Sequence, residues 1–221
     1  MEMPDDNSEL QPDERDRIMA SFSPEMQENF LHFHKVQTDS CKLLTILFTD
    51  LRFAATQLNA IPGEHPDAQF WRRTAIRTLA TTVEGEVFCF KRFALAASRL
   101  NGCPLVTEEQ FFLSEEFTEE AKEKKFRLSC FRENIKRTFK LVAKVLNSPC
   151  SVDFGRKGFE SLCEIYELRS ALMHPKSYES FAVTDDQTEK ADEAIAWVQD
   201  ATRTLFDLCK AYHKFPEPGL N

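Results

Sequence analysis

Apolar residues recur along most of the chain at spacings of three and four, which is the period of an amphipathic helix. The first such stretch follows Ser23 and Pro24, which suit the N-cap and the first position of a helix. It continues to about residue 58 and is marked by Leu43, Leu44, Leu47, Phe48 and Leu51. A break rich in proline and glycine follows at 61–66. The pattern therefore predicts a long first helix.

The longest uninterrupted pattern runs from Ala68 to Leu100. Its buried side is predicted to carry Phe70, Ile76, Leu79, Val83, Val87, Phe90 and Leu95. Gly85 is the one weak position inside it, because glycine lowers helix stability. The helix is expected to end at Asn101-Gly102, ahead of Pro104.

Two further helices are predicted in the middle of the chain. The sequence Thr-Glu-Glu-Gln at 107–110 has the form of a capping box and indicates a short helix from Thr107. Thr118 is expected to cap a long helix that ends near Asn147. Its apolar face is predicted to hold Leu128, Phe131, Ile135, Phe139, Val142 and Val145.

The last two predicted helices flank a proline. One runs from Arg156 to Met173 and ends there because Pro175 disfavours helical geometry in the residue before it. The other opens with a second capping box, Thr184 to Gln187, and ends before Pro216. It directs Ile195, Val198, Leu205 and Leu208 toward the core.

No stretch shows sustained alternation of period two, so the predicted fold is all-α: a single bundle of about five long helices plus one short helix. The composition agrees, since 221 residues contain 20 Phe and only 6 Gly. Residues 1–20 are predicted to be a flexible acidic leader, 21–214 the helical domain and 215–221 a C-terminal tail.

Charge and cysteine content narrow the class of protein. Lys and Arg number 28 against 36 Asp and Glu, a net charge of -8 that argues against a general nucleic-acid coat. The seven cysteines form no C-x-x-C pair, so we expect reduced and mostly buried thiols. The start of the chain has neither the basic nor the apolar region of a signal peptide, and the expected location is cytoplasmic.

One segment stands out chemically: Glu-Leu-Arg-Ser-Ala-Leu-Met-His-Pro at 167–175 places Arg169 and His174 at the end of a helix. Arg, a polar residue, a short spacer, His and then Pro resembles the signature of the HEPN superfamily (higher eukaryotes and prokaryotes nucleotide-binding), which is all-α. The Arg72-Arg73…Glu84 pattern on the long second helix is similar to the early helix of many bacterial members. The resemblance covers about Phe70 to Tyr212 and departs at Ser170, where active members more often carry Asn, Asp or His.

The resemblance implies a metal-independent endoribonuclease without a cofactor, acting as a homodimer whose two motifs form one composite site. His174 would be general base or acid, Arg169 would stabilise the transition state, Ser170 would position them, and the product would end in a 2′,3′-cyclic phosphate. The chemistry agrees, because RNA cleavage needs a base near pH 7 and a cation beside the phosphate. A toxin with an antitoxin partner, or an antiphage protein, is the implied setting.

Two alternatives remain open from the residues. A non-catalytic HEPN-like module would use the same side chains to bind RNA, a nucleotide or a protein. In the other alternative the motif is structural: an arginine pairs with an acidic neighbour, and a histidine is stabilised at a helix C-terminus by the macrodipole. Tyr166, Ser170 and His174 recur every fourth residue and are predicted to form one polar stripe.

A basic stripe is predicted on the helix expected at 118–147, which holds nine basic residues against four acids. Its regular members are Arg132, Lys136, Lys140 and Lys144. Such a stripe is able to follow an RNA backbone, although a solvated charged face is the commoner arrangement.

The sequence offers three weaker candidates for a functional site. His32 and His34 point away from each other on a helix and make no metal set with Cys41. Glu84 and Glu86, near Lys91 and Arg92, form either internal salt bridges or a buried carboxylate beside the motif. The sequence contains no Gly-rich phosphate-binding loop.

Overall fold

A computed structural model of the chain describes residues 20–114, 130–177 and 179–212. The described helices are α2 (Pro24–Ala60), α3 (Ala68–Leu100), α4 (Thr107–Ser114), α6 (Phe131–Val145), α7 (Lys157–Met173), the short 3-10 helix η1 (Glu179–Phe181) and α8 (Asp185–Tyr212). No strand occurs in this part of the chain, and the predicted all-α bundle is confirmed.

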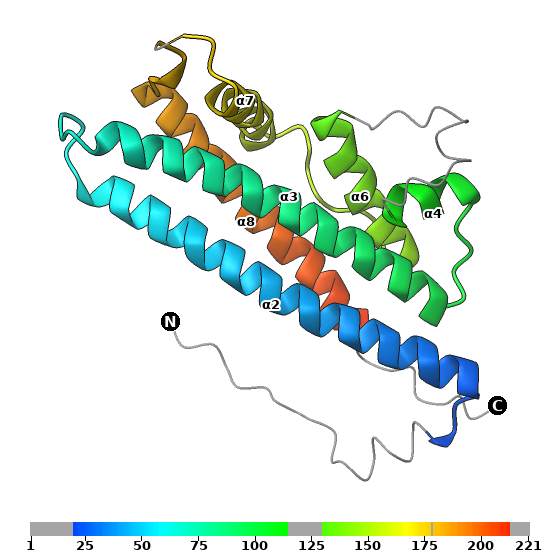
Figure 1. Cartoon of the computed structure of the whole chain (residues 1–221). Coiled ribbons are helices and arrows are strands. Elements are labelled where there is room, and N and C mark those ends of the chain that lie inside the picture. The colour runs from blue at the N-terminus through cyan, green and yellow to red at the C-terminus, as the bar shows by residue number, and fades with distance from the viewer. Residues whose placement is uncertain (1–19, 115–129, 178, 213–221) are drawn as a thin grey trace.

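Helix α3 is the central element of the bundle. It packs against α2, α4, α6, α7 and α8, whereas α2 packs mainly on α3. Figure 1 shows α2 and α3 as a long antiparallel hairpin, with α7 on the side of α3 away from α2 and α8 crossing behind α3. Helix α3 thus contacts every other long helix, while α7 and α8 also pack closely on each other.

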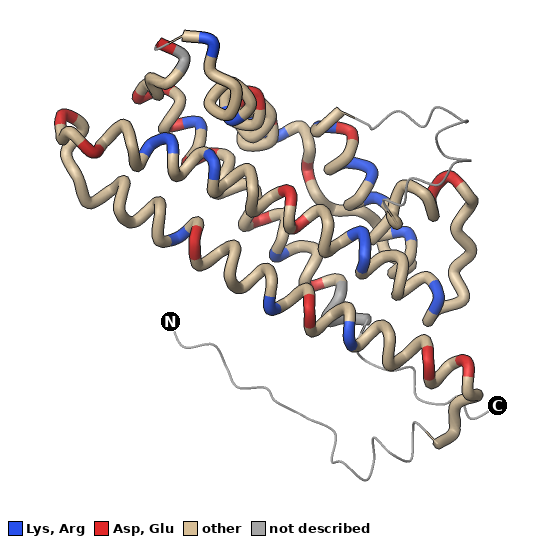
Figure 2. The backbone as a smooth tube through the Cα atoms, viewed as in Figure 1, with Lys and Arg blue, Asp and Glu red and all other residues tan. Residues whose placement is uncertain are grey.

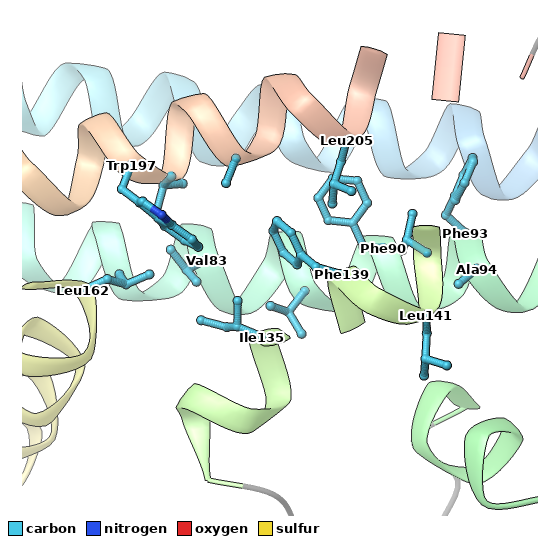
Figure 3. Close-up of a cluster of buried hydrophobic side chains, with 14 of the residues drawn as sticks. Val83, Phe90, Phe93, Ala94, Ile135, Phe139, Leu141, Leu162, Trp197 and Leu205 are labelled. Carbon is cyan, nitrogen blue, oxygen red and sulfur yellow. The ribbon is translucent and has the colours of Figure 1, made fainter. Parts of the chain in front are cut away.

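The core lies where α3, α6, α7 and α8 meet. Phe139 of α6 contacts Phe90 of α3, with ring centroids 5.7 Å apart, and stacks toward Trp197 of α8 at 6.4 Å. Figure 3 shows these rings pointing toward one another, with Val83 and Leu162 beside them. The many phenylalanines of the sequence thus supply the interlocking side chains that a bundle core requires.

Three predicted helix ends are confirmed. The Ser23 side chain accepts a hydrogen bond from the Met26 amide at 3.2 Å. At the end of α3, Gly102 has a φ of 59°, the left-handed conformation that glycine tolerates best. At the start of α8, Thr184 and Gln187 exchange side-chain to backbone hydrogen bonds of 2.9 and 3.2 Å, a complete capping box.

The capping box predicted at Thr107 is wrong by one residue. Thr107 is the first residue of α4, and the Glu109 side chain accepts a hydrogen bond from the Val106 amide at 3.1 Å. The glutamate therefore reaches back to the cap position, and the valine before Thr107 has no side-chain oxygen to return the bond.

The helix predicted over 118–147 is also wrong in its extent. Cys130 is extended, with a ψ of 157°, and α6 begins at Phe131. The remainder of that prediction, including Thr118 and Leu128, lies outside the described residues, as do the leader up to residue 19 and the tail. From Ile135 onward the predicted apolar face of this helix is buried as expected.

The pairing of α7 with α8 depends on one glycine. A Cβ atom built on Gly158 would lie 2.6 Å from the Trp197 Cβ atom and 2.7 Å from the Glu193 carbonyl oxygen. Because a backbone oxygen cannot move aside as a flexible side chain can, this close approach requires glycine at residue 158.

Cysteine burial differs from the prediction. Of the six cysteines whose side chains are described, all are free thiols, but only Cys89 is buried, while Cys41 and Cys130 are exposed.

Among the described helices, none combines the length and the apolar character that crossing a membrane requires.

Candidate functional site

The Arg-Ser-x-x-x-His motif lies at the C-terminal end of α7. Met173 is the last helical residue, and His174 caps the helix with a φ of -129°, ψ of 62° and its amide donating to the Ser170 carbonyl at 3.1 Å. The predicted termination before Pro175 is confirmed, and the His174 side chain is exposed. An imidazole at this position is open to solvent and to ligand.

Arg169 is held by a carboxylate from α3. Its Nη2 atom lies 3.5 Å from Oε2 of Glu84, and the Tyr166 hydroxyl donates to Oε1 of the same carboxylate at 2.9 Å. The guanidinium also lies over the Tyr166 ring, 5.8 Å from its centroid. With 27% of its side chain exposed, Arg169 is oriented by its neighbours and still reaches the surface.

Tyr166 links this cluster to α6. Its ring stacks face to face on Phe131, with centroids 3.7 Å apart and planes 8° from parallel. Burial raises the pKa of the Tyr166 hydroxyl, and the bond to the Glu84 carboxylate raises it further. The phenol therefore stays protonated at neutral pH and acts as a donor to Glu84.

Ser170 has a local partner. Its hydroxyl donates to the Tyr166 carbonyl at 3.2 Å, the usual i to i−4 bond of a helical serine. The proton of the Ser170 hydroxyl is therefore directed to the backbone of its own helix.

Three arginines of α3 bind backbone carbonyls of the motif and of the segment that follows it. Arg72 donates to the Val183 carbonyl at 3.0 Å and pairs with Asp185, while Arg73 donates to the Phe181 carbonyl at 3.2 Å. Arg77 donates to the carbonyl of Leu172 at 3.1 Å, two residues before His174. Sequence reasoning missed Arg77, although its spacing from Arg73 and Glu84 places all three on one side of the helix.

The four residues of the basic stripe on α6 have different surroundings. Arg132 pairs with Glu160 of α7, and Lys144 pairs with Glu109 of α4 at 2.7 Å. Lys136 lies 5.5 Å from the centroid of the Phe159 ring, and Lys140 is exposed. Figure 2 shows Lys and Arg positions along α6. The stacking of Phe131 on Tyr166 brings the start of α6 to the cluster around Arg169, while Arg132 and Lys136 lie beside Glu160 and Phe159 near the start of α7.

The two glutamates of α3 have different environments. Glu84 lies beside the motif, whereas Glu86 is fully buried against α8, hydrogen-bonded with the Thr202 hydroxyl. Burial raises the pKa of Glu86 to about 8. One predicted alternative was a buried carboxylate beside the motif. Glu84 lies beside the motif but is 39% exposed, and of these two glutamates the buried one is Glu86. Glu84 forms an ion pair with Arg169 of α7.

His32 and Cys41 are exposed on α2, and the His34 ring lies edge-on to Phe30 at 4.8 Å. In the described part of the chain, no group of three or more His, Cys, Asp or Glu side chains is placed to hold a metal ion.

The sequence and fold were compared with known proteins. No family model matches the chain, no curated protein matches its sequence, and no solved structure matches its fold.

Proposed function

We propose that the protein is a metal-independent endoribonuclease of the HEPN type that leaves 2′,3′-cyclic phosphate ends. The observation that carries the proposal is that Arg169 and His174 both reach the surface at the end of α7, with Arg169 oriented by Glu84. Imidazole supplies the base and acid of the reaction, and the guanidinium stabilises the charge on the phosphorane.

The RNA would extend from this motif toward α6. Lys140 is the exposed member of the basic stripe, and Lys136 is partly buried beside the Phe159 ring. Arg132 and Lys144 form ion pairs with glutamates. A second copy of the chain would complete the site with its own Arg169 and His174. The implied setting, a cytoplasmic toxin with an antitoxin or an antiphage protein, is part of the same proposal.

The test incubates wild type, Arg169→Ala and His174→Ala with total RNA in EDTA and examines fragment ends for cyclic phosphate. We expect cleavage by the wild type and a rate lower by about 10²–10⁴-fold in each variant, because each loses one chemical role. Melting temperatures should stay within about 2 °C, since both side chains lie at the surface.

Matched controls are His32→Ala and Arg156→Ala, which remove an exposed histidine of α2 and an arginine at the other end of α7. Both should cleave as the wild type does. Equal cleavage by all five proteins would indicate a contaminating nuclease and contradict the proposal.

A second candidate is a non-catalytic RNA-binding module, which the backbone bond of the Ser170 hydroxyl favours. RNA binding by the wild type without cleavage, weakened in Arg169→Ala and in Lys140→Glu, would support this candidate over the enzyme.

A further inference from the structure

A pocket of about 440 Å³ lies between α2 and α3, outside the motif. The two helices run side by side along their length (Figure 1). Ala54 of α2 and Thr74 and Thr78 of α3 line the pocket with small side chains, which leave space between the helices. A cavity of this size suits a small ring system or one unit of a longer ligand.

Three aromatic side chains line one end of the pocket. Phe53 of α2 is 57% exposed and Phe70 of α3 is 55% exposed. Each ring meets that of Trp71 edge to face, with centroids 6.0 and 5.2 Å apart. Phe53 and Phe70 therefore keep more than half of their surface open to solvent. A flat aromatic ligand such as a nucleobase would cover this surface by stacking.

Asp50 supplies a polar group in the same pocket. It lies one helical turn before Phe53 on α2 and is exposed. Within the described part of the chain, its carboxylate takes part in no hydrogen bond or ion pair. An ionised carboxylate has two oxygens and only accepts hydrogen bonds. Guanine is the RNA base whose Watson–Crick edge offers two adjacent donors, N1–H and the N2 amino group, so the pocket fits guanine best.

The other end of the pocket lies beside the motif. Arg77 lines the pocket and donates to the Leu172 carbonyl at 3.1 Å, two residues before His174. A nucleotide next to a base bound in the pocket would therefore come close to the end of α7. The sequence has no Gly-rich phosphate-binding loop, which favours a base carried by a strand over a free nucleotide.

We propose that this pocket binds the guanine base of a single-stranded RNA. The strand is single because the edge of the base that faces Asp50 is occupied in a duplex. The proposal rests on the proposed function only for the statement that this RNA is also the substrate.

The test measures the binding of labelled 2′-O-methyl RNA strands to the full chain by fluorescence anisotropy. Each strand is a short run of uridines with guanosine, adenosine or cytidine at its centre, and the methyl groups prevent cleavage through the 2′-hydroxyl. We expect the guanosine strand to bind about 10-fold more tightly than the other two, because only guanine satisfies both carboxylate oxygens. The same strand should quench the fluorescence of Trp71, since Trp197 is 6% exposed and lies in the core.

Two variants separate recognition of the base edge from stacking. Asp50→Asn should reduce the preference for guanosine to less than about 2-fold, because the amide nitrogen is a donor that faces the donors of guanine. Phe53→Leu should weaken binding of the guanosine strand by about 10-fold, since a base stacks on an aromatic ring. The matched control is Ile46→Ala, which changes a 59% exposed apolar residue of α2 outside the pocket lining and should bind as the wild type does.

Equal affinity for the three strands would overturn the proposal. So would a preference for guanosine that persists in an Asp50→Asn protein with a wild-type circular dichroism spectrum. Binding of GMP as tight as that of the guanosine strand would overturn the assignment to RNA and indicate a free guanine nucleotide. A preference for guanosine in a protein that cleaves no RNA would contradict the proposed function and leave the guanine pocket in place.

Discussion

Glu84 and Glu86 lie two residues apart on α3 and have opposite environments. Two residues rotate a helix by about 200°, so one carboxylate faces the open surface and the other faces α8. Glu84 is 39% exposed and is contacted by the Tyr166 hydroxyl and the Arg169 guanidinium. Glu86 is 2% exposed, with Thr202 as its hydrogen-bonding side chain. The same residue type thus serves a surface site on one face of α3 and lies within the core on the other.

The Thr202 hydroxyl contacts both the Glu86 carboxyl group and a backbone carbonyl. A hydroxyl has one proton to donate, yet Thr202 lies between the Glu86 carboxyl group and the Val198 carbonyl, 2.7 Å away. A protonated Glu86 would donate to the hydroxyl, and the hydroxyl would donate to Val198. Burial is what raises the pKa of Glu86, whereas a hydrogen bond donated by the Thr202 hydroxyl to the carboxylate acts in the opposite direction.

The largest expected difference between the two faces of α3 concerns packing. Phe90→Ala should lower the free energy of unfolding by about 3–5 kcal/mol, because its ring fills the contact with Phe139. Phe88→Ala, on the open face, should change it by less than about 0.5 kcal/mol. Denaturation in urea, followed by the fluorescence of Trp71 and Trp197 at the lowest workable protein concentration, measures both without contribution from a dimer. Equal losses would show that Phe88 belongs to the monomer core.

The next difference is in pH dependence. The pKa of Glu86 is about 8 in the folded protein and 4.5 when the side chain is exposed to water in the unfolded chain. Between pH 4.5 and pH 8 the folded state therefore keeps a proton that the unfolded state releases. This contribution to stability is fully present below pH 4.5 and is lost as the pH rises through 8, at about 1 kcal/mol per pH unit.

Glu86→Gln should remove this slope, and Glu84→Gln should keep it. The measurement is the urea unfolding free energy of the three proteins from pH 5 to pH 8, taken as differences so that other titrating groups cancel. A wild-type slope that survives in Glu86→Gln would assign the pH dependence to another group.

The smallest effects come from deleting the two hydroxyls that contact these carboxyl groups. Thr202→Val should cost about 1–3 kcal/mol, since it leaves a buried carboxyl group without its partner. Tyr166→Phe should cost less than about 1 kcal/mol, because Glu84 is partly solvated and keeps Arg169. Thermal unfolding by calorimetry ranks the two variants, and a larger loss for Tyr166→Phe would reverse the comparison.

The comparison also shows which parts of the site were predictable. The end of α7 at His174 followed from Pro175, because the restriction that proline places on its neighbour is local. The contact of Glu84 with Arg169 joins residues 85 positions apart and depends on how α3 and α7 cross. The start of α6 at Phe131 was missed, since its apolar spacing continues smoothly into the residues before it.

The amino-acid sequence by itself determined the helical class, most helix boundaries and the placement of Arg169 and His174 at a helix end, because spacing, capping and proline effects act within a few residues. Only the tertiary structure decided that Glu84 orients Arg169, that Phe131 stacks on Tyr166, and that Glu86 is buried against Thr202. These contacts depend on the crossing of helices distant in sequence, and a helix pattern specifies which face is apolar without specifying which neighbour covers it.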